Sequence, residues 1–303
     1  MKFIINDAEH GITIKQFMER RRYSSRLITR LKAKERGILV NGERKTVRWV
    51  LSCGEILELE TEDSCSSSGI TPSFVPIKVL YEDQWFIVVE KTANLPVHPS
   101  HNHLDDTLAS RVMAYFHGQS FVFRALTRLD LDTSGAVIIA KDSISATLFS
   151  KLLEERKVKK EYIAVCHGIF DEKEGVIDFN IRRVRKFKME REAVPKGIGH
   201  GENSPEGIEA VTEYSVLREA KGMSLVRFIP VTGRTHQLRV HARAIGHPII
   251  GDSLYSSPSP YISRQALHAE RLSFIHPMTN EAVSVVCPLC EDLDICVKEL
   301  FDE

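Results

Sequence analysis

The chain has 303 residues, of which 43% are hydrophobic and 27% are charged, so it can build a sizeable core and is not disordered as a whole. Its 41 basic residues balance 41 acidic ones. Taken alone, this neutral balance argues against a nucleic-acid-binding protein, which usually carries a basic excess. No apolar run approaches the roughly 18 residues needed to cross a bilayer, and Asn6 and Asp7 interrupt the N-terminal apolar stretch. We therefore expect a cytoplasmic protein without membrane contact.

Charge is distributed unevenly along the chain. Between Lys15 and Arg48, twelve basic residues stand against three acidic ones, which leaves a local charge of +9. The tail from Glu291 has six acidic residues against the single Lys298. The neutral total is thus a cancellation between a basic N-terminal region and an acidic tail.

The basic region has the pattern of a small folded unit with two helices. Thr13 and Gln16 fit a capping box that begins the first helix. Ser24 or Ser25 can cap the second helix, and Gly37 can end it in the left-handed conformation.

Two strands are predicted after these helices. Residues 38–40 and 55–60 are β-rich, and Asn41-Gly42 is typical of a hairpin turn. The first sixty residues are therefore expected to form a small α/β domain.

A basic stripe follows one face of the second helix, where Arg26, Arg30 and Lys34 recur every four residues. Acidic partners at helical spacing are nearly missing, so the positive charges repel one another within the stripe. A phosphate backbone would relieve that repulsion, and this favours nucleic-acid binding over a plain solvated face.

A polar segment at 61–75, rich in Ser, Thr, Gly and Pro, is predicted to be a linker. From residue 76 to 303, strand-like and helical runs alternate without a regular βαβ rhythm. This indicates an α+β domain built on a mixed sheet. Basic residues also recur from Arg182 to Arg191, either as a second backbone contact or as a solvated loop.

Three segments of the larger domain are candidates for chemistry. Asp130 lies on a polar turn just before an apolar strand at 136–140, although such residues often only cap the turn. Tyr162 begins a strand at 162–166, where a core or edge tyrosine is the simpler interpretation. Thr235 can cap a helix that ends at Gly246, and an arginine just before it, Arg234, would stabilise an ionised Asp130 if the two met.

Together these segments resemble the RluA/RluD-type pseudouridine synthases. The resemblance rests on Arg128-Leu129-Asp130 followed by Thr133-Ser134-Gly135, on KKEYIAV, on GRTHQLRVH with GHPIIGD, and on ALHAERLSFIHP. Thr127 replaces the usual histidine of the first motif, and Lys91-Thr92-Ala93-Asn94 replaces a more usual Lys-Pro-Ala-Gly. The first sixty residues resemble the small RNA-binding domain named from a ribosomal small-subunit protein.

The resemblance implies a pseudouridine synthase fold, with a mixed and largely antiparallel sheet, and an isomerase that converts uridine in RNA to pseudouridine. It implies no cofactor and no metal. Asp130 is the implied catalytic group at the ribose, and it either attacks C1′ or removes the C2′ proton. Tyr162 and Arg234 complete the implied catalytic set. Leu238 packs beside the base, and Arg128 holds the nucleotide out of its stack.

The RNA itself stays open at this point. A basic accessory domain on this catalytic type implies large-subunit ribosomal RNA, with transfer RNA as the alternative, bound by a monomeric enzyme through residues such as Arg26, Arg30 and Lys34. A non-catalytic ribosome-assembly factor is a rival reading, but it leaves the Asp130 motif unexplained. A metal enzyme using the histidines and aspartates of 98–106, or a zinc site at Cys287, Cys290 and Cys296, is disfavoured because neither has a complete ligand spacing.

Overall fold

The computed structural model describes residues 1–21, 23, 25–60, 67, 69–100, 103–184, 189–196 and 206–302, and for Arg26 only the backbone. Across these residues the chain forms a four-stranded sheet, a nine-stranded sheet and a two-stranded ribbon. No helix in these ranges is long and apolar enough to span a membrane. The predicted linker at 61–75 and one candidate cap, Ser24, lie wholly or partly outside the described residues.

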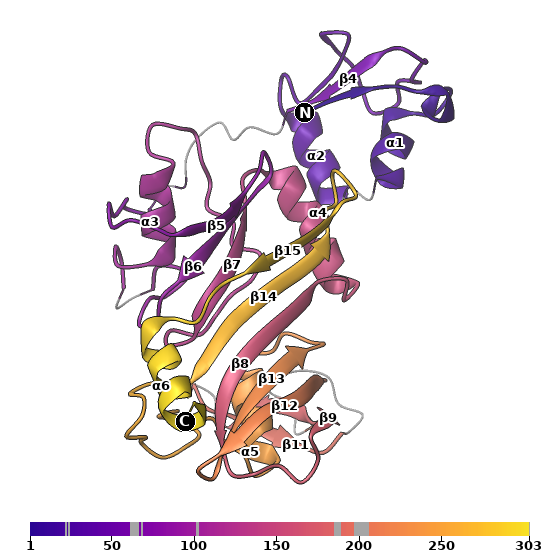
Figure 1. Cartoon of the computed structure of the whole chain (residues 1–303). Coiled ribbons are helices and arrows are strands. Elements are labelled where there is room, and N and C mark those ends of the chain that lie inside the picture. The colour runs from indigo at the N-terminus through magenta and orange to yellow at the C-terminus, as the bar shows by residue number, and fades with distance from the viewer. Residues whose placement is uncertain are drawn as a thin grey trace.

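The small sheet is built by the N-terminal residues (Figure 1). Its strands run antiparallel in the order β1-β4-β2-β3, and they are β1 (Lys2–Ile4), β2 (Ile38–Val40), β3 (Glu43–Arg44) and β4 (Ile56–Leu59). A 3-10 turn (Asp7–Glu9), α1 (Ile14–Arg20) and α2 (Ser25–Ala33) complete the unit. Apolar side chains from both helices and three strands form one core, among them Phe17, Leu31 and Leu57.

Local signals in this unit are largely confirmed. The Gln16 N–H donates to Thr13 Oγ1 at 3.2 Å, and the Thr13 N–H donates to Gln16 Oε1 at 2.8 Å, which is the predicted capping box. Asn41 and Gly42 both have positive φ and turn β2 into β3.

The expectation for Gly37 is wrong. It does not adopt the left-handed conformation, and α2 already ends at Ala33. A Cβ at Gly37 would stand 2.0 Å from the backbone oxygen of Leu31, so close approach of the chain, rather than a cap, requires glycine.

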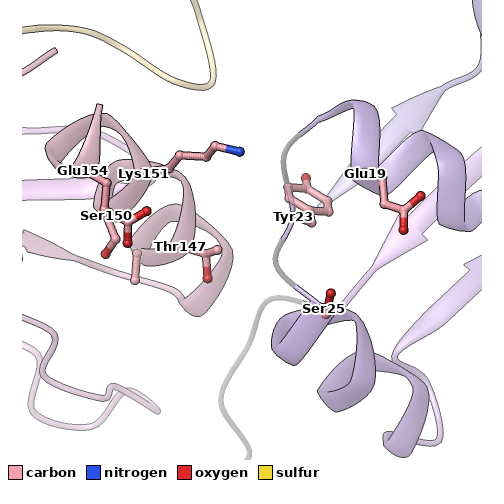
Figure 2. A pocket seen from close by; sticks show the side chains of 8 residues that line it. Glu19, Tyr23, Ser25, Thr147, Ser150, Lys151 and Glu154 are labelled. Carbon is pink, nitrogen blue, oxygen red and sulfur yellow. The ribbon is translucent and has the colours of Figure 1, made fainter. Parts of the chain in front are cut away.

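The N-terminal unit packs on α4 (Ser143–Glu154) of the larger domain. Ile144 is fully buried within the N-terminal core, and Leu148 packs against it. Beside this contact lies a polar cleft of about 540 Å³, with Tyr23 on one wall and Lys151 on the other (Figure 2).

The large sheet has the order β5-β6-β7-β14-β8-β13-β12-β9, and β15 also pairs with β14. In the described part of this sheet, only β7 and β14 run parallel, and all other neighbouring strands are antiparallel. The strands are β5 (Val79–Glu82), β6 (Phe86–Lys91), β7 (Ser134–Ala140), β8 (Lys159–His167), β9 (Glu174–Ile177), β12 (Thr212–Ala220), β13 (Met223–Pro230), β14 (Leu267–Ile275) and β15 (Ala282–Val286). This mixed, largely antiparallel sheet with few helices confirms the expected α+β class.

Helices cover both faces of the sheet at β6 and β7, where nearly every strand residue is buried. Alternate residues of β6 and β7 pack on α3 (Leu108–Tyr115), and the others pack on α4. Strand β8 packs with α5 (Gln237–Ala244) and α6 (Glu291–Phe301) in a third core. The ribbon of β10 (Asn180–Arg183) and β11 (Arg191–Val194) lies beside α5. Arg182 pairs there with Glu192 at 2.7 Å, while residues 185–188 of the predicted basic run lie outside the described chain.

The start of α5 differs from the sequence prediction. Its N-cap is His236, in the left-handed conformation, and not Thr235. The Gln237 side chain ties the preceding loop instead, because it accepts from the Thr232 hydroxyl at 2.8 Å and donates to the Val211 carbonyl at 2.9 Å. Gly246 ends the helix region with positive φ, as predicted.

Replacing Gly135 by Ala should be strongly destabilising. Gly135 has φ +125°, and an added Cβ would meet the backbone of Ala269 at 2.4–2.5 Å, across the parallel pair β7–β14. We expect the free energy of unfolding, measured by urea denaturation, to fall by about 3 kcal/mol or more. Gly222→Ala is the matched control, since Gly222 also has positive φ but open space around it, and should cost only about 1 kcal/mol. Equal losses in the two variants would contradict this account.

Candidate active site

Asp130 lies on the turn that leads into β7. The Thr133 N–H donates to the Asp130 carbonyl at 3.2 Å, which closes the turn, and every residue of the following strand is buried. The Asp130 side chain keeps 27% of its surface exposed. The turn therefore presents a carboxylate to solvent from a rigid support.

Arg239 of α5 holds this carboxylate. Its Nη1 donates to Asp130 Oδ2 at 3.0 Å, while its Nε and Nη2 donate to the two carboxylate oxygens of Asp252 at 2.7 and 2.8 Å. Arg239 and Asp252 are almost completely buried, with 5% and 1% of their side chains exposed. The guanidinium thus connects the turn to α5 through a planar fork that lysine cannot reproduce.

The expected pairing of Arg234 with Asp130 is wrong. Arg234 is exposed, and its Nε donates to the backbone carbonyl of Glu209 at 2.9 Å. The helix is capped one residue later than predicted, at His236 instead of Thr235, and Arg234 lies before it as expected. The arginine that reaches Asp130 is Arg239, within the helix. Sequence reasoning placed Arg239 on a polar face of the helix but gave it no partner.

Further contacts fix the orientation of the fork. Asp252 also accepts the backbone N–H groups of Leu254 and Tyr255, and the Tyr255 hydroxyl is 2.8 Å from His236 Nδ1. Burial alone would lower the pKa of Arg239, but its bonds and charge interactions with Asp252 and Asp130 outweigh that effect and raise it. Arg239 is therefore a permanent cation at physiological pH.

Two more buried cations hold the backbone of the same turn. Lys91 Nζ donates to the carbonyls of Leu131, Leu95 and Thr92 at 2.7, 2.8 and 2.9 Å. Arg264 Nη1 donates to the carbonyl of Asp132 at 2.9 Å. Consecutive carbonyls of the turn are thus fixed from opposite sides, one from the end of β6 and one from the segment before β14.

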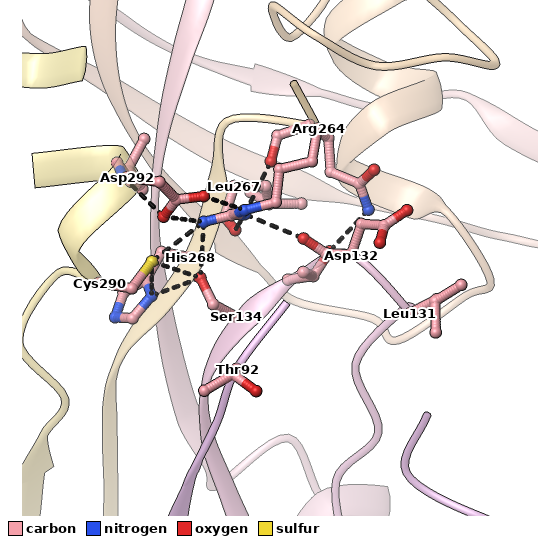
Figure 3. Close-up of polar contacts among 12 residues, drawn as sticks. Thr92, Leu131, Asp132, Ser134, Arg264, Leu267, His268, Cys290 and Asp292 are labelled. Atoms are coloured by element: carbon pink, nitrogen blue, oxygen red, sulfur yellow. Dashed lines mark hydrogen bonds and ion pairs between the residues drawn. The ribbon is translucent and has the colours of Figure 1, made fainter. Parts of the chain in front are cut away.

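Arg264 also connects the turn to the C-terminal helix (Figure 3). It donates to both carboxylate oxygens of Asp292, at 2.7 and 2.9 Å, and to Cys290 Sγ at 3.0 Å. Ser134 Oγ lies 3.1 Å from the same sulfur and 2.9 Å from His268 Nδ1. The first turn of α6 is therefore part of the frame around the Asp130 turn.

The environment of these groups shifts their protonation. Burial lowers the pKa of Lys91 to about 7, and the charges of Asp132 and Asp130 offset only part of that effect. Arg264 holds the pKa of Asp292 at about 2, although partial burial opposes this.

Tyr162 reaches the site through the register of the sheet. It stands opposite Ala269 of β14, and Ala269 stands opposite Gly135 of β7, so the three lie in one row across adjacent strands. Burial raises the pKa of Tyr162, and the charge of Asp130 raises it further. The phenol therefore stays protonated at physiological pH and lies within range of the Asp130 charge.

The predicted substrate-binding residues differ in burial and in their partners. Leu238 is 6% exposed and packs in the core that also contacts Tyr162. Arg128 is exposed two residues before Asp130, and its charge, after burial, lowers the pKa of nearby His98. Arg30 is exposed on α2, whereas Lys34 is ion-paired with Glu60 at 3.2 Å; the Arg26 side chain lies outside the described part of the chain.

Within the described ranges, no three His, Cys, Asp or Glu side chains come together as a metal-binding group. Cys290 contacts Arg264 and Ser134, and His103 contacts Asp106 at 2.7 Å; His101 and Asn102 lie outside those ranges.

Sequence reasoning missed most of the supporting frame. Asp252 ends the GHPIIGD motif, where a lone carboxylate after an apolar run is a usable signal for a buried partner. Lys91 ends an apolar strand, and Arg264 precedes another, so both could have been suspected of being buried cations. Their targets are backbone carbonyls, which leave no trace in a sequence.

Comparisons with known proteins agree on one family. A family model described as RNA pseudouridylate synthase matches residues 85–244. An uncharacterised RNA pseudouridine synthase of Bacillus subtilis, YjbO, is 34% identical over 289 residues, which cover 95% of this chain and 99% of that protein. Ribosomal large subunit pseudouridine synthase D of Blochmanniella floridana is 32% identical over 282 residues, or 84% of each chain. The solved structure of human RNA pseudouridylate synthase domain containing 1 has a TM-score of 0.59 and 29% identity, over 74% of this chain and 89% of that one.

The fold and these matches define an RNA-modifying isomerase, whose reaction turns uridine into pseudouridine. The chain belongs to the RluA/RluD-type RNA pseudouridine synthase family.

Exchange of Arg239 for Lys should lower turnover about 100-fold or more, because lysine cannot bind Asp252 through two parallel bonds and still reach Asp130. The reaction releases the uracil C5 hydrogen, so tritium release from RNA labelled with [5-³H]uridine measures it. Arg234→Lys is the matched control and should keep turnover within about twofold of the wild type. A larger loss in Arg234→Lys than in Arg239→Lys would restore the original assignment.

Proposed function

We propose that Asp130 is the catalytic group of this isomerase and acts on the ribose of the target uridine. The reaction breaks the N1–C1′ bond, turns the uracil and joins C5 to C1′; the C5 proton leaves and N1 gains one. Either attack on C1′ or removal of the C2′ proton requires an ionised carboxylate. The observation that carries this proposal is the partly exposed Asp130 carboxylate, 3.0 Å from a buried guanidinium.

The other site residues have roles around the base. Tyr162 contacts the uracil ring and is a candidate to move the C5 proton, since its phenol is protonated and feels the charge of Asp130. Leu238 supplies an apolar contact to the base, and the exposed Arg128 holds the nucleotide out of its stack. Extrusion of the base costs a few kcal/mol, which contacts elsewhere on the RNA must offset.

We further propose that the substrate is large-subunit ribosomal RNA. Relatives named ribosomal large subunit pseudouridine synthase D, from Blochmanniella floridana and Neisseria meningitidis, are 32% and 33% identical to this chain. A separate basic unit suits a large folded RNA, because it adds backbone contacts remote from the reacting uridine.

Asp130→Asn should abolish modification and leave RNA binding within about threefold of the wild type, because the amide keeps the shape of the carboxylate but not its charge. Pseudouridines are mapped in total RNA from cells lacking the protein, after expression of either form. We expect sites in large-subunit RNA that appear only with the wild type. Modification by Asp130→Asn at the wild-type rate would overturn the catalytic assignment, and sites confined to transfer RNA would overturn the substrate.

The N-terminal unit is proposed to dock the RNA through α2. The side chains of Arg30 and Lys32 on α2, and of Arg36 just beyond its end, are exposed and have no hydrogen bond or ion pair with a described residue. The Lys32 carbonyl accepts a bond from the Arg44 side chain. Lys34 shares its charge with Glu60, so its contribution to docking is smaller than a count along the helix indicates. Arg26 completes the proposed set from the sequence pattern.

Arg30→Gln should weaken binding of large-subunit RNA and reduce the slope of log Kd against log salt by about 0.7–0.9, as expected for one lost phosphate contact. Binding is measured by filter retention at several salt concentrations. Lys15→Gln is the matched control, because Lys15 is already paired with Glu19 at 3.6 Å and lies on α1. An unchanged slope for Arg30→Gln would remove α2 from the docking surface.

A further inference from the structure

Two adjacent lysines begin strand β8 and lie on opposite faces of the sheet. Side chains alternate along a strand, so Lys159 shares a face with Glu161, and Lys160 shares a face with Tyr162. Lys159 is exposed and pairs with Glu161 at 3.0 Å. Lys160 is half-buried and has no hydrogen bond or ion pair with any described residue.

No carboxylate of the described chain compensates the charge of Lys160. Burial lowers its pKa, and no neighbouring charge opposes that effect. Its ammonium lies over Gly233, since a Cβ built there would stand 3.6 Å from Lys160 Nζ and have no closer neighbour. Gly233 belongs to the loop that leads into α5, the helix whose Arg239 holds Asp130.

An ammonium partly removed from water and without a partner is costly, and the buried cations near the Asp130 turn all have partners among the described residues. Lys91 donates to three carbonyls, and Arg239 and Arg264 each bind a carboxylate. The partial desolvation of Lys160 is therefore not offset by a described partner in the free enzyme. An anion of the bound substrate at this position would stabilise the Lys160 ammonium.

We propose that Lys160 binds a phosphate of the RNA chain next to the target uridine. This rests on the proposed function of Asp130 and Tyr162. Uracil and ribose are neutral, so the anions that an extruded nucleotide brings into the site are its flanking phosphates. Lys160 stands one alternate position along β8 from Tyr162, about 7 Å of strand, which suits a contact beside the base rather than at the glycosidic bond.

The test uses Lys160→Gln with Lys159→Gln as the matched control, one strand position away on the opposite face. Uridine and uridine 3′,5′-bisphosphate serve as probes, and binding is followed by NMR chemical shifts. For the wild type and Lys159→Gln, we expect the bisphosphate to bind at least tenfold tighter than uridine. Lys160→Gln should lose most of this difference while its affinity for uridine itself stays unchanged.

Stability and turnover separate this role from the alternatives. Lys160→Gln should unfold at the same or a higher urea concentration than the wild type, because a half-buried unpaired charge is removed. With saturating RNA, its turnover should stay within about threefold, while KM rises about tenfold. A turnover loss with unchanged affinity would mean that Lys160 takes part in the chemistry, and equal effects of the two lysine variants would mean general electrostatics; either result overturns the proposal.

The same binding assay on Asp130→Asn tests the phosphate site independently of the catalytic role of Asp130. The Asp130→Asn variant should keep the preference for the bisphosphate, because the phosphate contact does not pass through that carboxylate. If Asp130→Asn is active but Lys160→Gln loses the preference, the catalytic assignment fails and the phosphate site stands. If Asp130→Asn is inactive and Lys160→Gln keeps the preference, the phosphate site fails alone.

Discussion

The guanidinium of Arg239 lies between two carboxylates that come from distant parts of the chain, and the site is arranged around it. Asp252 takes two of its bonds and Asp130 takes the third. A buried charge is tolerated only when it is fully paired. Folding therefore cannot bury Arg239 without bringing the Asp130 turn against α5, so the same requirement stabilises the domain and positions the carboxylate.

The turn itself illustrates why several cations are needed. Residues 130–132 lie in a turn before β7 and form no strand hydrogen bonds, so their carbonyls need other partners. Lys91 and Arg264 satisfy the carbonyls of Leu131 and Asp132, and in doing so they fix the backbone on both sides. Arg264 passes the constraint on to α6 through Asp292, which lies beyond the segment that the family model matches. The C-terminal helix thus acts on the site without contacting Asp130.

Elements whose signal is local were predictable, and pairings across the fold were not. The capping box at Thr13, the hairpin at Asn41 and the apolar strands follow from neighbouring residues alone. Arg234 was misassigned because the resemblance was carried over to the arginine just before the predicted helix, whereas the arginine that reaches Asp130 lies within α5, at Arg239.

The charge pattern of the sequence also missed ion pairs, because the partners come from distant parts of the chain. Along α2 the sequence shows almost no acidic partner at helical spacing, yet Glu60 reaches Lys34 from the end of β4. The acidic tail likewise forms the first turn of α6, where acidic residues favour a helix N-terminus and Asp292 pairs with Arg264. Once such pairs are set aside, the charges that remain available to RNA are few and specific. Among the described residues they include Arg30 and Lys32 on α2, Arg128 beside the Asp130 turn and Lys160 on β8, and a formal charge of zero for the whole chain says nothing about these local charges.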